Sequence, residues 1–203
     1  MIINDRYKFI FVHIQKTAGT SITNSLFELP ETKHLHHPHS KLNTIDLDNY
    51  KDYIKFCFVR NPFDRLVSWY NMILQKGIHN DWSKYILENS NSFSEFLDLT
   101  EVVNETNPIE LISEIEYPKS ISHNQIDYIT DKSGNIQSDF IGRFENINED
   151  FTKISDMIGF KDLSLLYLNS FNHKQYRNYY KDSDIEKVFN LYKKDIDYFN
   201  YHF

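Results

Sequence analysis

The stretch FVHIQKTAGTSI, residues 11–22, leads from an apolar run through a polar turn into a helical pattern. It predicts a strand over 8–14 and a helix over 20–27. The same alternation of apolar strands and amphipathic helices recurs along the chain. We also expect strands over 54–59 and 138–144. Helices are expected from Pro62, over 149–158 and, after a capping box at Ser183, along an apolar repeat that reaches Phe199. This order predicts an α/β fold, P-loop-like, with three α/β/α layers and a central parallel sheet.

The turn at the centre of that stretch is typical of an anion site. A strand that passes through a glycine-containing turn into a helix aims main-chain N–H groups and the positive end of the helix dipole at one point. Lys16 adds a positive charge, and Thr20 and Ser21 add hydroxyl donors. The Gly-Lys-Ser/Thr ending with which triphosphate loops hold magnesium is absent, which disfavours a metal-dependent kinase. Taken alone, a solvated turn with an exposed lysine is an equally ordinary interpretation.

A second motif, FVRNPFDRLVSWY over residues 58–70, places Arg60 at the carboxyl end of a strand and Ser68 about two turns into the next helix. Ligands of open α/β sheets bind at the carboxyl ends of the strands, so Arg60 and Lys16 are expected to converge. Arginine grips phosphate with a planar fork of donors, and a serine can add another. The alternative is an Arg60 in a surface salt bridge and a solvated Ser68.

Composition limits the remaining possibilities. The 203 residues fit a single domain over 1–203, with 76–135 as a helical or loop insertion that contributes to an acceptor site. The formal net charge of −7 disfavours general nucleic-acid binding, which needs excess Lys and Arg. Cys57 lies in an apolar run and is expected to be buried. With neither an integral membrane segment nor a signal peptide in the sequence, we expect a cytoplasmic protein.

Together, the two motifs resemble those of the sulfotransferase family, in particular carbohydrate sulfotransferases of the heparan sulfate 2-O-sulfotransferase type and bacterial family 2 sulfotransferases. Residues 139–151 and the C-terminal stretch extend the resemblance. It implies that 3′-phosphoadenosine 5′-phosphosulfate (PAPS) is the co-substrate, that Arg60 and Ser68 bind its 3′-phosphate, and that a hydroxyl of a carbohydrate accepts the sulfuryl group. The residues it assigns to the 5′-phosphosulfate are Gln15, Lys16, Thr17, Ala18, Gly19, Thr20 and Ser21.

The resemblance also implies a catalytic histidine. Sulfuryl transfer needs in-line attack and stabilisation of the leaving oxygen, for which Lys16 can serve without a metal. Family members carry a His-x-His-x-Ser-like segment between the two motifs, and the nearest counterpart here makes His39 the expected base, with His37 next. An inert histidine loop is the main alternative. A metal site is disfavoured because no cysteine or carboxylate lies among the histidines and Pro38 breaks their spacing.

Further basic residues are also candidates for the nucleotide site. Arg143, at the end of a predicted strand, can orient the nucleotide or pair with Glu145. Lys174, with His173 and Arg177, precedes the last helix, where family members often close over the nucleotide, and a solvated basic turn is the alternative. The competing functions are a non-catalytic nucleotide- or sulfate-binding module and a P-loop-like kinase, which would require magnesium.

Overall fold

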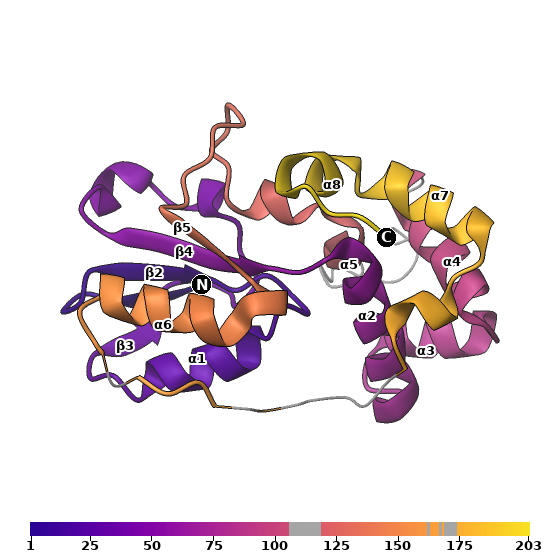
Figure 1. Ribbon diagram of the computed structural model, residues 1–203, viewed down its shortest axis with the longest axis horizontal. Coiled ribbons are helices and arrows are strands. Elements are labelled where there is room, and N and C mark those ends of the chain that lie inside the picture. Colours follow the sequence, from indigo (N-terminus) through magenta and orange to yellow (C-terminus); the bar gives the residue numbers. More distant parts are fainter. Residues whose placement is uncertain (106–118, 162, 167, 169–173) are drawn as a thin grey trace. The chain divides into compact units, whose positions relative to one another are not determined.

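The computed structural model describes residues 1–105, 119–161, 163–166, 168 and 174–203 (Figure 1). The chain divides into two compact units, Met1–Arg60 with Gln125–Ser170 and Asn61–Asn124 with Phe171–Phe203. The single domain with an insertion over 76–135 remains a prediction, and residues 106–118 of that insertion lie outside the described residues.

A five-stranded sheet forms the first unit, in the order β3-β1-β2-β4-β5. The strands are β1 (Ile2–Asn4), β2 (Phe9–Val12), β3 (Thr32–His34), β4 (Ile54–Val59) and β5 (Phe140–Arg143). β4 pairs in parallel with both β2 and β5, whereas β1 is antiparallel to both β2 and β3. The predicted α/β class with a parallel centre is therefore confirmed, and two antiparallel strands extend it on one side.

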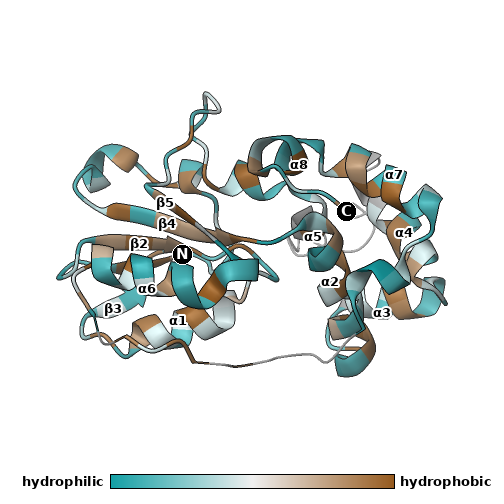
Figure 2. Cartoon of the chain, viewed as in Figure 1, coloured by the Kyte–Doolittle hydropathy of each residue, from teal (hydrophilic) through white to brown (hydrophobic). Residues whose placement is uncertain are grey.

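Two helices of the first unit, α1 (Gly19–Phe27) and α6 (Ile147–Met157), share one apolar core with the sheet. Figure 2 shows the hydrophobic colour along β2 and mixed hydrophilic and hydrophobic colours along both helices. Four aromatic rings of this core come from alternate positions of β2 and β4: Phe9, Phe11, Phe56 and Phe58. Burying one such ring is worth about 1.5 to 3 kcal/mol, so the four rings are a main source of the unit's stability.

The boundaries of these elements differ slightly from those predicted. β4 spans the predicted residues, but β2 is shorter than 8–14 because the chain turns where the N–H of Ile14 donates to the oxygen of Val12 at 3.1 Å. β5 is likewise shorter than 138–144, and α6 starts at Ile147, before the predicted 149. Short 3-10 helices fill the connections: η1 (Leu42–Thr44), η2 (Leu47–Tyr50), η4 (Gln125–Tyr128), η5 (Phe144–Asn146) and, in the second unit, η6 (Tyr176–Tyr179).

Helices form the second unit: α2 (Pro62–Lys76), α3 (Asp81–Asn89), α4 (Phe93–Glu105), α5 (Lys119–Ser122), α7 (Asp182–Leu191) and α8 (Lys193–Phe199). As predicted, α2 begins at Pro62, and the side chain of Asn61 caps it by accepting from the N–H of Phe63 at 3.0 Å. The prediction of one continuous last helix capped at Ser183 is wrong. The helix is interrupted at Tyr192, between α7 and α8. The side chain of Asp184 caps the start of α7 by accepting from the N–H of Lys181.

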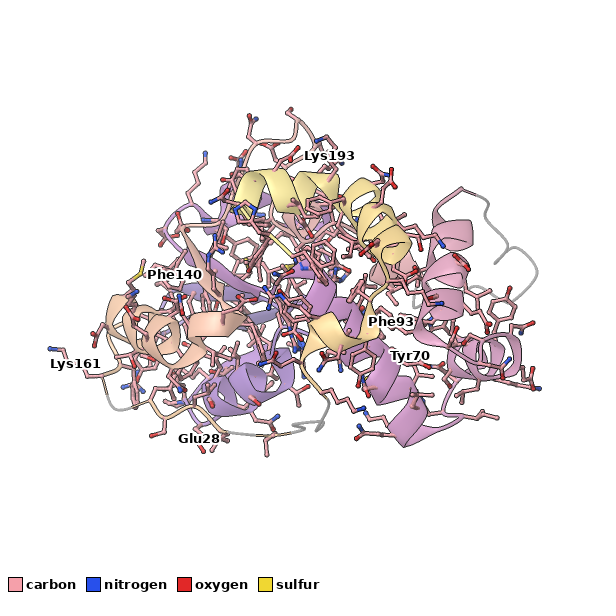
Figure 3. All side chains as sticks on the ribbon, turned by 45° about the vertical axis from the view of Figure 1, so that its right-hand side comes forward. Glu28, Tyr70, Phe93, Phe140, Lys161 and Lys193 are labelled. Atoms are coloured by element: carbon pink, nitrogen blue, oxygen red, sulfur yellow. The ribbon has the colours of Figure 1, made fainter. Side chains whose placement is uncertain are left out.

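Aromatic side chains hold the second unit together. Tyr70 and Phe93, both labelled in Figure 3, have ring centroids 5.4 Å apart. Phe93 also meets Tyr180 edge-on at 4.8 Å, and the hydroxyl of Tyr180 donates to the oxygen of Phe63 at 2.8 Å. Tyr70 thus packs among aromatic rings, as its position on the apolar face of the helix suggests.

Candidate functional site

The loop between β2 and α1 has a strained backbone. Lys16 and Ala18 adopt the left-handed conformation, with φ of 66° and 63°, which costs of order 1 to 3 kcal/mol for each residue that is not glycine. Ala18 stands at the N-cap of α1 and supplies no capping side chain, and the first helical turn contains no acidic residue. Main-chain N–H groups at a helix start of this kind suit an anion.

Glycine at position 19 is not needed for its backbone conformation, because the φ of Gly19 is not in the left-handed region. A Cβ atom at this position would lie only 1.9 Å from Cδ2 of His13 and 2.0 Å from its Nε2. The imidazole of His13 therefore occupies the place of a side chain at Gly19. No motif in the sequence singles out His13, although it lies at the end of the strand that leads into the loop.

Arg60 joins the loop from the end of β4. Its side chain is buried, with 6% of the residue exposed, and its Nη1 donates to the oxygen of Lys16 at 3.2 Å. Its guanidinium also lies 3.9 Å above the ring of Phe144. Lys16 and Arg60 come together as predicted, and the alternative of an Arg60 in a surface salt bridge is wrong because the side chain is buried.

The main chain of Arg60 is held by Gln125, which no motif in the sequence singles out. The N–H of Arg60 donates to Oε1 of Gln125 at 2.9 Å, and Nε2 of Gln125 donates back to the oxygen of Arg60 at 2.8 Å. Gln125 is completely buried. Its side-chain amide thus continues the hydrogen bonding of the sheet beyond β4 and fixes the point at which Arg60 leaves it.

Two of the loop hydroxyls hold the loop in place. The hydroxyl of Thr17, a fully buried residue, donates to the oxygen of Ile14 at 2.9 Å. Ser21 Oγ donates to the oxygen of Leu168 at 3.2 Å and accepts from its N–H at 3.1 Å. Thr20 is exposed. Of the two hydroxyls expected to serve an anion, that of Ser21 is thus engaged with the protein, whereas that of Thr20 faces solvent.

The histidine segment lies beside the same loop through His39. Its Nδ1 is 3.1 Å from the main-chain oxygen of His13, and the two imidazole centroids are 4.6 Å apart. Since a carbonyl oxygen can only accept, Nδ1 of His39 carries the proton and donates it. In the neutral ring, Nε2 of His39 then keeps the lone pair that a base needs.

The neighbouring histidines are arranged differently. His37 is exposed, and its Nδ1 accepts a long hydrogen bond of 3.5 Å from the N–H of His39. Nδ1 of His36 lies 2.9 Å from the hydroxyl of Ser40. The amino group of Met1 donates to the oxygens of His37 and Pro38 at 2.8 and 2.9 Å, which ties this segment to β1.

Burial sets the charge of two groups next to this segment. It lowers the pKa of the Met1 amino group to about 5. It also lowers the pKa of His13 well below its usual 6.5, and the nearby His39 and Met1 amino group lower it further. His13 is therefore a neutral imidazole near neutral pH. Among the described residues, no group of three or more His, Cys, Asp or Glu side chains is arranged to hold a metal ion.

The remaining candidates stand on other elements of the chain. Arg143 is half-buried on β5, where its N–H donates to Asp150 at 2.8 Å. Ser68 is buried on α2 of the second unit, and Lys174 of that unit is exposed. His173 lies outside the described residues. Nucleotide binding by Arg143, Ser68 and Lys174 stays a prediction.

Comparison with known proteins identifies the family. A search among curated proteins gives no match. The family model described as the sulfotransferase family matches residues 1–202, almost the full length of the chain. In the part of the chain that the structure describes, no helix has both the length and the apolar character needed to cross a membrane. The match spans the loop, Arg60 and the histidine segment together, and the chain belongs to the sulfotransferase family.

Proposed function

We propose that this protein transfers the sulfuryl group of PAPS to a hydroxyl group, with a carbohydrate as the acceptor. Membership of the family supports sulfuryl transfer in general. The observation that carries the more specific proposal is the contact between Arg60 and the main chain of Lys16, because it gathers two cationic residues at a helix start. A donor that bears a phosphosulfate and a separate phosphate needs two such cationic groups.

The residues present fit that donor. The strained loop, Gln15 to Ser21, offers main-chain N–H groups and the charge of Lys16 to the 5′-phosphosulfate. Arg60 provides a fork of donors for the 3′-phosphate, with Ser68 as the proposed second donor. Its guanidinium is held against Phe144, which reduces the conformational entropy lost when a phosphate binds. Arg143 and Lys174 are proposed to contribute further contacts to the nucleotide.

The proposed reaction is an in-line displacement at sulfur. The acceptor oxygen forms a bond to sulfur while the bond from sulfur to the bridging oxygen breaks, and the electron pair of that bond passes to the 5′-phosphate. Lys16 stabilises the charge that develops on the bridging oxygen. The proton of the acceptor hydroxyl passes to a histidine base. The products are a sulfate ester and adenosine 3′,5′-bisphosphate.

His39 is the proposed base, and its tautomer supports the choice over His37. Nδ1 of His39 donates to a carbonyl oxygen, so Nε2 can accept a proton. Nδ1 of exposed His37 accepts a long hydrogen bond of 3.5 Å from a main-chain N–H, which favours the neutral tautomer with the hydrogen on Nε2 rather than the one a base needs there. His39 also lies against His13 at the end of β2, close in sequence to the loop that would hold the donor.

The test is transfer of labelled sulfate from PAPS to a panel of polysaccharides and oligosaccharides, with release of free sulfate as an acceptor-independent measure. We expect His39→Ala to lower turnover by about 10²- to 10⁴-fold, the usual contribution of a general base. His34→Ala is the matched control, because His34 is an exposed histidine on β3. Equal turnover in His39→Ala and His34→Ala would contradict the assignment of the base. Tight binding of the nucleotide without any transfer would favour a non-catalytic binding module.

A further inference from the structure

We propose that His13 is a positioning residue that holds His39 in the tautomer and orientation of a base, and that it joins the base to the donor loop as one packed unit. This inference rests on the proposed function for its catalytic meaning. Its structural content, the state of the His39 ring, can be measured without any substrate.

The first support is the packing of the His13 ring. The ring stacks on Phe11 with a centroid distance of 5.8 Å and an interplanar angle of 21°. It meets the His39 ring edge-on at 4.6 Å and 74°. It also fills the place that a side chain on Gly19 would take. One imidazole therefore contacts the core, the base and the first residue of α1, and movement of any one of them disturbs the others.

The second support is the hydrogen bond between the two histidines. The main-chain oxygen of His13 accepts from Nδ1 of His39, which selects the tautomer whose Nε2 bears the lone pair. The same residue thus supplies both the oxygen that selects the tautomer and the ring that fixes the orientation. Loss of the ring leaves the oxygen in the chain but removes the lateral contact that keeps His39 aligned with it.

The charge of His13 fits this role. Its ring faces the titratable groups of His39 and of the Met1 amino terminus, and burial keeps it neutral. When His39 takes up a proton, a neutral neighbour does not repel the new charge. A protonated His13 would disfavour the imidazolium of His39 and weaken it as a base. The arrangement assigns proton transfer to His39 and support to His13.

Gly19 provides a specific genetic test. In Gly19→Ala, the new methyl group collides with the His13 ring, so we expect a lower melting temperature and a turnover reduced by about 10- to 100-fold, the effect of a small misplacement of reacting groups. In the double variant Gly19→Ala/His13→Ala the collision is removed. The melting temperature should then return to that of His13→Ala, while turnover stays low. A double variant no more stable than Gly19→Ala would overturn the proposal.

The decisive measurement is the ¹⁵N spectrum of the histidine rings, with the His39 signals assigned from a His39→Gln sample. In the wild type above the pKa of His39, we expect Nδ1 to be protonated and Nε2 to be unprotonated. His13→Ala should give a mixture of the two tautomers, whereas His13→Phe, which keeps a neutral ring, should preserve the wild-type form. An unchanged His39 tautomer in His13→Ala would overturn the proposal. Because this spectrum needs no donor or acceptor, a failure of the proposed sulfuryl transfer would leave its result intact.

Discussion

Replacement of Gln125 by leucine tests how the end of β4 is held. In the native protein, the buried amide of Gln125 exchanges two hydrogen bonds with the main chain of Arg60, at 2.9 and 2.8 Å. Leucine has a similar volume, so the substitution leaves little cavity. It removes both of these hydrogen bonds while the N–H and oxygen of Arg60 stay in place in the main chain.

The magnitude follows from the burial of the two groups. A buried donor or acceptor without a partner costs about 1 to 3 kcal/mol, so two of them give about 2 to 6 kcal/mol. For a chain of this size, each kcal/mol lowers the melting temperature by about 2 to 4 °C. The expected fall is therefore about 4 to 24 °C. Affinity for the nucleotide should fall as well, because the position of Arg60 depends on the same pair of hydrogen bonds.

Urea unfolding followed by circular dichroism measures the change in the free energy of unfolding. Gln175→Leu is the matched control, because Gln175 is an exposed glutamine of the second unit, where a substitution should stay within about 0.5 kcal/mol. If Gln125→Leu is as stable as Gln175→Leu, the hydrogen bonds to Arg60 do not hold the end of the strand, and the reasoning fails.

Three further predictions concern stability. Burial holds the pKa of folded His13 below the unfolded value of about 6.5, so the stability that neutral His13 contributes is present above pH 6.5 and is lost as the pH falls towards the folded pKa. Melting curves between pH 5 and 8 should therefore show a smaller loss of stability at acid pH in His13→Phe than in the wild type. Parallel curves for the two proteins would exclude this role. Asn61→Ala should cost about 0.5 to 2 kcal/mol, because Asn61 caps α2 and also donates to the oxygen of His202, whereas equal urea midpoints would show that the cap contributes nothing. Thr17→Val should cost about 1 kcal/mol through the lost bond to Ile14 in the same urea assay, and an unchanged stability would mean that this bond does not hold the loop.

The centre of the fold could be predicted because its signals are local. An apolar run marks β4, and the pair Asn61-Pro62 marks the start of α2. The strands β1 and β3 were missed because each has only three residues and gains its hydrogen bonds by pairing within the sheet. No hydrophobic pattern of that length identifies a strand. The break at Tyr192 was missed because the helical spacing of apolar residues continues across it.

The candidate site was predictable only in part, for similar reasons. Lys16 and Arg60 could be found because parallel strands end at the same edge of a sheet, and that rule needs no knowledge of side chains. The link from Arg60 to Gln125 spans 65 positions of the chain and leaves no local pattern. The role of His13 depends on the space over Gly19, which exists only in the folded protein. The sequence therefore located the cations of the site but not the residues that position them.

The central claim is that Arg60 and the loop of Lys16 bind the nucleotide of PAPS. Calorimetric titration with adenosine 3′,5′-bisphosphate in the absence of magnesium tests this claim most directly. ATP with magnesium is the competing ligand pair. Arg6→Ala is the matched control for Arg60→Ala, because Arg6 is an exposed arginine of the same unit. We predict magnesium-independent binding of the bisphosphate that is retained in Arg6→Ala and weakened about 10- to 150-fold in Arg60→Ala, the value of charged hydrogen bonds worth about 1.5 to 3 kcal/mol. Absence of bisphosphate binding, a preference for ATP with magnesium, or equal affinity in Arg60→Ala and Arg6→Ala would contradict the account.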